Sequence, residues 1–191
     1  HLSFLGLALV LRGWGLFSLR TSPVGDEGLN GYFAIAWARE WKWEFFITSG
    51  QLPPFLTWAL CPLFKFIRDP LFDLWALPAA LSFLTVLLGY WAAREYFSRP
   101  FAVLSAWLLS FGFWPVFMGR LCHQGAVIPF WECGLLLLLT TFMRSKAKGK
   151  RSLLAFALGC VAGLGSLFYT SWPVLVLAVL VPALVRTPLR V

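Results

Sequence analysis

Two adjacent carboxylates, Asp26 and Glu27, are the residues whose type and position most directly suggest chemistry in this sequence. Only 8 of the 191 residues are acidic, and this pair follows the first apolar segment. A carboxylate in the first turn of a helix faces unpaired N–H groups and the positive end of the helix dipole, so it stays ionised and can accept a proton. The pair therefore suits both a helix N-terminal cap and the polar centre of an active site at a membrane boundary, and the two roles are compatible.

Other polar residues fall in segments that we expect on the same side of the membrane as this pair. They are Asn30, Gln51, Arg120, His123, Gln124, Tyr169 and Ser171. Arg120 is a candidate anion-binding residue because a guanidinium binds phosphate through two parallel N–H bonds. Its structural alternatives are a side chain extended toward the lipid headgroups and a partner for Asp26. His123 is a candidate proton shuttle or metal ligand, although a single histidine in a turn is more often neither. We predict no metal site from these residues, and a divalent cation stays open.

The composition is that of an all-α integral membrane protein. Hydrophobic residues make up 60% of the sequence, charged residues make up 13%, and the mean hydropathy is +0.78. These values lie outside the range of soluble domains. The net charge of +8 does not indicate nucleic acid, because the basic residues fall at segment ends and in one loop. The four cysteines lack C-x-x-C spacing and suit small buried hydrophobes, with a Cys61–Cys122 disulfide as the alternative.

Apolar segments predict about six transmembrane helices, at residues 2–19, 71–97, 101–118, 124–143, 153–169 and 172–185. The first contains Arg12, whose side chain we expect to extend toward the lipid headgroups. Residues 20–70 form a long first outer loop that is too aromatic for a disordered linker. Within it, residues 27–43 and 53–67 predict two interfacial amphipathic helices. The apolar face of the first is expected to consist of Leu29, Tyr32, Phe33, Ala36, Trp37 and Trp41.

The orientation follows from the segment RSKAKGKR, which puts five basic residues into positions 144–151. Cytoplasmic loops are enriched in Lys and Arg, so we expect this loop in the cytoplasm. The turn at 94–99 then also lies inside, while the loop at 20–70 and the turns at 119–123 and 169–172 face outward. The fifth apolar segment carries GCVAGLG, whose small residues favour close helix packing.

The two ends of the sequence suggest that it belongs to something longer. It begins with His1, and it ends at Val191 shortly after an apolar run. We expect residues 1–191 to form a single transmembrane domain, the N-terminal part of a larger protein. The sequence contains no internal repeat and no segment typical of a soluble domain.

Several short motifs occur in a characteristic order. Arg12 ends the first span, the acidic pair lies in GDEGLNGYFAIA, a proline pair follows in SGQLPPFLTWALCPLF, AAREYFSRP ends the second span, Arg120 lies in FMGRLCHQGAVIPF, and GLGSLFYTSWPVLVL joins the last two spans. This order resembles the N-terminal portion of the GT-C class of membrane glycosyltransferases, specifically the protein-mannosyltransferase-like group that includes the aminoarabinose transferases acting on lipid A. The chain departs from the family at Gln51-Leu52, where a histidine often precedes the proline pair, and in lacking a second acidic residue after the third span.

The resemblance implies a GT-C-like fold and an inverting transfer of a sugar from a polyprenyl-phosphate carrier. The acceptor would be a hydroxyl of a lipid, protein or glycan on the non-cytoplasmic face. Asp26 then matches the general base, Glu27 supports it, and Arg120 faces the lipid phosphate. The further predicted substrate-binding residues are Gln51, His123 and Tyr169. The lipid-linked sugar is the donor substrate, no cofactor is predicted, and the expected location is the bacterial inner membrane with the site facing outward.

Two other classes of function stay open. A transporter or flippase-like protein would use the Asp26/Glu27 pair to bind a cation or proton, because carboxylates at membrane depth commonly mark ion pathways. A non-catalytic membrane subunit or anchor would need the pair only as helix caps. Apart from Glu132, the ionisable residues gather at the ends of the spans and not near their middle, which favours the enzyme over the transporter.

Overall fold

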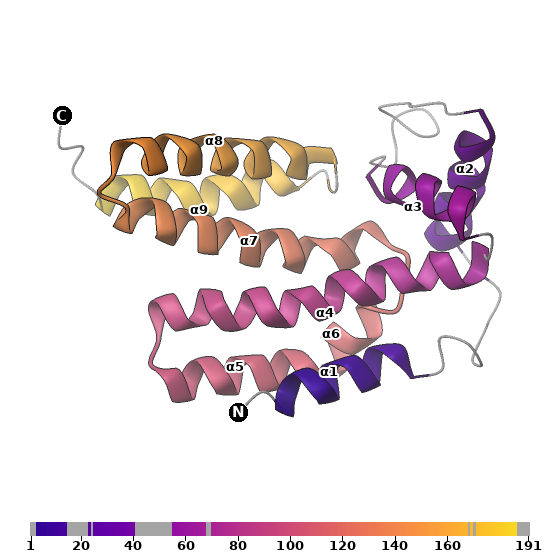
Figure 1. Ribbon diagram of the computed structural model, residues 1–191, viewed down its shortest axis with the longest axis horizontal. Coiled ribbons are helices and arrows are strands. Elements are labelled where there is room, and N and C mark those ends of the chain that lie inside the picture. Colours follow the sequence, from indigo (N-terminus) through magenta and orange to yellow (C-terminus); the bar gives the residue numbers. More distant parts are fainter. Residues whose placement is uncertain are drawn as a thin grey trace.

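A computed structural model describes residues 3–14, 23, 25–40, 55–67, 70–167, 169 and 171–186. Over these ranges the chain is helical, and none of the described residues forms a strand (Figure 1). The α-helices are α1 Ser3–Gly13, α2 Asp26–Glu40, α3 Phe55–Phe66, α4 Pro70–Tyr96, α5 Arg99–Phe111, α6 Phe113–Met118, α7 Gln124–Arg144, α8 Lys148–Leu164 and α9 Trp172–Arg186. A 3-10 helix, η1 Gly165–Leu167, continues α8. The all-α prediction is therefore confirmed.

Three of the described helical segments are long and apolar enough to cross a membrane. They are Phe72–Tyr96, Gln124–Arg144 and Lys148–Leu167, and each meets the requirement of about 20 residues for a hydrocarbon core. Shorter apolar helices occupy Ser3–Gly13, Phe55–Phe66, Arg99–Phe111 and Trp172–Val181. The chain is a membrane protein by this measure, and three of the six predicted spans are represented only by shorter helices.

Residues 101–118, predicted as one span, do not form one continuous helix, because the helix breaks at Gly112. The backbone there is extended, with φ −53° and ψ 132°, and α6 starts at the next residue. A continuous helix would drive the ring of Pro115 against the carbonyl of Phe111, four residues earlier. A Cβ at position 112 would lie 2.5 Å from the Leu108 carbonyl oxygen, so the break also requires glycine.

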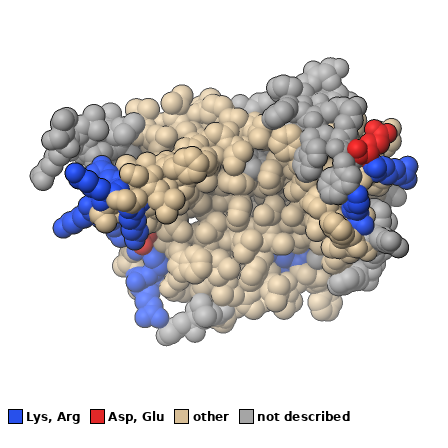
Figure 2. Space-filling view, turned by 45° about the horizontal axis from the view of Figure 1, so that its top comes forward, with Lys and Arg blue, Asp and Glu red and all other residues tan. Residues whose placement is uncertain are grey.

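The long helices run back and forth between two ends of the molecule (Figure 1). One end, here called the site end, holds α2, α3, the 119–123 turn and η1. The other, here called the basic end, holds the 97–98 turn and the 144–151 segment, and Figure 2 shows Lys and Arg gathered there. The exposed residues of that end include Arg99, Arg144, Lys146, Lys148, Lys150 and Arg151. The loops thus divide between the ends as the sequence predicted.

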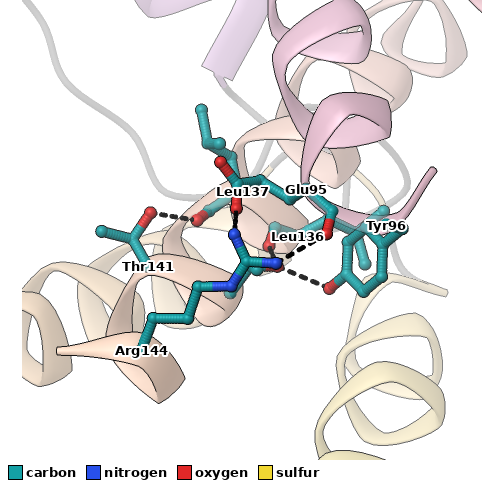
Figure 3. A network of polar contacts seen from close by, with 7 residues as sticks. Glu95, Tyr96, Leu136, Leu137, Thr141 and Arg144 are labelled. Atoms are coloured by element: carbon teal, nitrogen blue, oxygen red, sulfur yellow. Dashed lines mark hydrogen bonds and ion pairs between the residues drawn. The ribbon is translucent and has the colours of Figure 1, made fainter. Parts of the chain in front are cut away.

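Polar contacts at the basic end fix α4 to α7 (Figure 3). Arg144 forms an ion pair with the Glu95 carboxylate, and its Nη2 donates to the Glu95 carbonyl oxygen at 2.8 Å. The Thr140 hydroxyl lies 2.6 Å from the Tyr96 hydroxyl. These contacts join the last turns of two membrane-length helices that run in the same direction, and thereby fix their register.

Helices α2 and α3 confirm the two helices predicted within residues 20–70, although residues 41–43 and 53–54 lie outside the described part of the chain. The predicted apolar face of α2 is partly wrong. Its buried residues are Asn30, Gly31, Ala34 and Trp37, whereas Tyr32 is 67% exposed. The buried face of α2 therefore includes the polar side chain of Asn30, whose amide finds hydrogen-bond partners there.

Arg12 does not extend to the headgroups, contrary to the prediction. Its side chain is 2% exposed and donates to the carbonyl oxygens of Leu109 at 2.8 Å and Ser110 at 3.0 Å. The break at Gly112 removes the helical N–H groups that would serve these two carbonyls. Away from water such acceptors need a donor, and a guanidinium on α1 supplies it.

Candidate active site

The 119–123 turn, between α6 and α7, is held by the first two turns of α2. Glu27 Oε1 accepts the Cys122 backbone N–H at 2.9 Å, and Asn30 Nδ2 donates to the Cys122 carbonyl at 3.1 Å. Asn30 Oδ1 in turn accepts from Gln124 Nε2 at 3.2 Å and from the Thr57 hydroxyl at 3.4 Å. Both backbone polar groups of Cys122 are thus satisfied by side chains of α2, which fixes the turn against that helix.

The same turn also approaches α4 closely. Gly119 is buried, and a Cβ at that position would lie 2.2 Å from the Ser82 hydroxyl oxygen and 2.9 Å from the Pro115 carbonyl oxygen. Real side chains do not tolerate such distances, so glycine is required by packing at this position. The turn therefore sits between α2 and α4 with little freedom to shift.

Asp26 contacts His123 across this turn. The two side chains approach to 3.2 Å between Nε2 and Oδ2, and they are 37% and 43% exposed for His123 and Asp26 respectively. His123 Nδ1 accepts the backbone N–H of Gly125 at 2.9 Å and so caps α7. A neutral imidazole has one donor and one acceptor nitrogen, so the proton resides on Nε2 and is donated to the Asp26 carboxylate.

Neither acidic residue acts as the N-cap of α2. The residue before the helix is Gly25, at φ +55°, and its carbonyl oxygen accepts the Leu29 N–H at 3.1 Å. Glycine adopts this left-handed conformation without steric cost. Asp26 and Glu27 occupy the first turn, and each directs its carboxylate to the 119–123 turn instead of its own helix.

Asp26, Glu27, Met118, Leu121 and His123 line an open pocket of about 280 Å³ at the site end; we call it the Asp26 pocket. The ionised Asp26 is oriented by a neutral donor and remains partly open to solvent, which is the arrangement needed by a group that accepts a proton. Glu27 has one oxygen committed to the Cys122 backbone and serves first to position the turn.

The other predicted site residues are placed differently. Arg120 lies in the same turn but is absent from the lining of the Asp26 pocket, and the described partner of Asp26 is His123 and not Arg120. Tyr169 is 37% exposed and follows η1 in the chain, before α9 begins; it too is outside that lining. Gln51 lies outside the described residues.

Residues outside the predicted set also build the site. The sequence indicates Asn30 and Gln124 only as polar residues on the outer side, and it does not single out Thr57. A signal for Asn30 was present, because it follows Asp26 by four residues and so lies one helical turn further along the same face. No comparable spacing points from Asn30 to Thr57 or Gln124, which come from other helices.

Cys122 does not supply a nucleophile in this site. It is fully buried, and burial raises the pKa of its thiol, an effect to which the Glu27 carboxylate adds. The thiolate is the reactive form of cysteine, so Cys122 stays neutral and inert. It is a free cysteine, as is Cys61, and the alternative of a disulfide between them is wrong.

No protein-family model, curated protein or solved structure matches this chain. Among the described residues, no group of three or more His, Cys, Asp or Glu side chains is arranged to hold a metal ion.

Proposed function

We propose that the protein is a multi-pass membrane glycosyltransferase that moves a sugar from a polyprenyl-phosphate carrier to an acceptor hydroxyl. The observation that carries the proposal is the Asp26–His123 contact at 3.2 Å in an open pocket at one end of the membrane helices. A fixed, ionised carboxylate open to solvent suits the deprotonation of a hydroxyl. The motif order described above supplies the substrate class.

In the proposed reaction, the acceptor oxygen attacks the anomeric carbon of the sugar as Asp26 takes the hydroxyl proton. The new carbon–oxygen bond forms while the bond to the phosphate oxygen breaks, and the phosphate leaves with the electron pair. The attack comes from the side opposite the leaving group, so the configuration inverts. His123 positions Asp26, and Glu27 positions the turn that carries His123.

The proposed orientation places the basic end in the cytoplasm and the Asp26 pocket on the outer face of a bacterial inner membrane. The cluster of exposed Lys and Arg at residues 144–151 supports it, because cytoplasmic loops carry an excess of these residues. Helices α2 and α3 would then lie at the outer interface, beside the carrier lipid.

The test uses membranes that contain the protein and radiolabelled polyprenyl-phosphate sugars. Asp26→Asn preserves the shape of the side chain and removes the base, so we expect transfer to fall by about 10²–10⁴-fold. The matched control is Glu40→Gln, which neutralises an exposed acid on the same helix and should transfer normally. Full activity of Asp26→Asn at equal protein level would contradict the proposal.

A transporter is the second candidate, and Glu132 is the observation that favours it. This acid lies within the membrane-length helix α7 and is half-buried, and carboxylates at such a depth often mark ion pathways. Substrate uptake that depends on a proton gradient and is lost in Glu132→Gln, without any sugar transfer, would support this alternative.

A further inference from the structure

Arg12 is a buried cation that no carboxylate neutralises within the described part of the chain. Its Nε donates to the Ser82 hydroxyl at 2.8 Å. The remaining acceptors are the carbonyl oxygens of Leu109, Ser110 and Ala8, at 2.8, 3.0 and 3.4 Å. All four acceptors are neutral, and the ion pairs between described residues involve other side chains. A guanidinium has five N–H groups, so these four contacts leave one for a ligand.

This guanidinium lines a second, more enclosed cavity of about 90 Å³, here called the Arg12 cavity. Its polar lining includes Ser82 and Thr85, and it contains no carboxylate. Gly125 and Ala126, in the first turn of α7, also line the cavity. The backbone N–H groups of these two residues bond to His123, so what α7 adds beside the Arg12 charge is the partial positive charge of its N-terminus.

The Arg12 cavity adjoins both the Asp26 pocket and the outer surface of the helices. Met118 lines both cavities, so the two adjoin at this side chain. Trp114, which is 63% exposed, and Pro129, which is also exposed, line the Arg12 cavity where it reaches the surface between α6 and α7. On the same helix as Trp114, the exposed rings of Phe113 and Phe117 are stacked, and such an apolar surface suits an alkyl or prenyl chain.

We propose that the Arg12 cavity binds the phosphate group of a membrane lipid whose chain leaves between α6 and α7. The identity of this lipid rests on the proposed function: it is the polyprenyl-phosphate carrier, and its sugar extends past Met118 toward Asp26. An inverting attack needs the base and the leaving phosphate on opposite sides of one carbon atom, and two adjoining cavities meet that need. Arg12 takes the phosphate-facing role that the sequence suggested for Arg120, which lines neither cavity.

The test measures binding by calorimetry, with the protein in nanodiscs and geranyl phosphate as the probe. We expect binding at least tenfold tighter than that of geraniol and of inorganic phosphate. Arg12→Gln should weaken it at least tenfold, and so should Pro129→Trp, which fills the mouth. Leu104→Trp, at an exposed position on α5 outside the cavity, is the matched control and should bind normally. Since Arg12→Gln also removes donors to α5, Pro129→Trp decides the outcome if Arg12→Gln fails to fold.

Several outcomes would overturn the proposal. If geraniol binds as tightly as geranyl phosphate, the cavity has no anion-binding site. If inorganic phosphate binds as tightly as geranyl phosphate, the ligand is a free anion and not a lipid. Normal binding by Pro129→Trp would place the lipid elsewhere. If geranyl phosphate binds as expected but the wild type transfers no sugar, the proposed function fails and the lipid-phosphate site stands. If transfer occurs but neither variant changes binding, the proposed function stands and the lipid-phosphate site fails.

Discussion

The imidazole of His123 bridges two helices, with Nε2 at 3.2 Å from Asp26 Oδ2 on α2 and Nδ1 at 2.9 Å from the Gly125 backbone N–H on α7. One side chain thus caps a membrane-length helix and orients the proposed base. The two contacts involve different nitrogen atoms, so substitutions can separate them.

Asparagine and glutamine at position 123 should have opposite effects. His123→Asn places an oxygen near the position of Nδ1, so it keeps the cap but cannot reach Asp26. His123→Gln places a donor nearer the position of Nε2, so it keeps the contact with Asp26 and loses the cap. We expect His123→Asn to retain thermal stability while kcat falls by up to about 10²-fold, the effect of misplacing a catalytic group by about 1 Å.

For His123→Gln we expect nearly normal kcat and a loss of stability of about 0.5–2 kcal/mol, the usual effect of removing an N-cap. The measurements are kcat and KM for sugar transfer, together with the thermal midpoint in detergent. If both variants lose activity and stability in parallel, His123 acts only as a cap.

The sequence predicts those parts of the structure that depend on local apolar content. The three membrane-length helices, α2, α3 and the division of loops between two ends follow from hydropathy and charge. The burial of Arg12 could not be predicted in this way, because its acceptors exist only when the chain breaks at Gly112. The Asp26–His123 contact likewise depends on how α2 docks on the 119–123 turn. The alternation of the spans predicts only that the two residues lie on the same side of the membrane.

Asn30 is expected to be critical for stability, because it satisfies the Cys122 carbonyl, Gln124 and Thr57 at a fully buried position. Asn30→Ala leaves these groups without a partner, at a cost of about 1–3 kcal/mol. Thermal unfolding in detergent checks the loss. The control is Tyr32→Phe on the exposed face of the same helix, which should unfold at the wild-type temperature. An unchanged midpoint in Asn30→Ala would show that the hydrogen bonds do not hold the turn.

Gly119→Ala should destabilise the site end and reduce transfer. The added methyl group would lie 2.2 Å from the Ser82 hydroxyl oxygen, and that hydroxyl accepts a hydrogen bond from Arg12. Overpacking of this kind costs about 1–3 kcal/mol. Gly159→Ala is the comparison, because a Cβ there meets nothing within 4 Å and a helical alanine is favourable. Equal behaviour of the two variants would contradict the close approach of the turn to α4.

The orientation can be tested with cysteines at the two ends of the molecule, Glu40→Cys and Lys146→Cys, both at exposed positions. We expect a membrane-impermeant maleimide to label Glu40→Cys in intact spheroplasts and to label Lys146→Cys only after permeabilisation.

The native cysteines should contribute little to this labelling. Cys61 and Cys122 are buried, and Cys133 and Cys160 lie within membrane-length helices. The raised pKa of Cys122 further limits its reaction, which requires the thiolate. Labelling of Lys146→Cys in intact spheroplasts would place the Asp26 pocket in the cytoplasm, where the proposed outward-facing transfer could not take place.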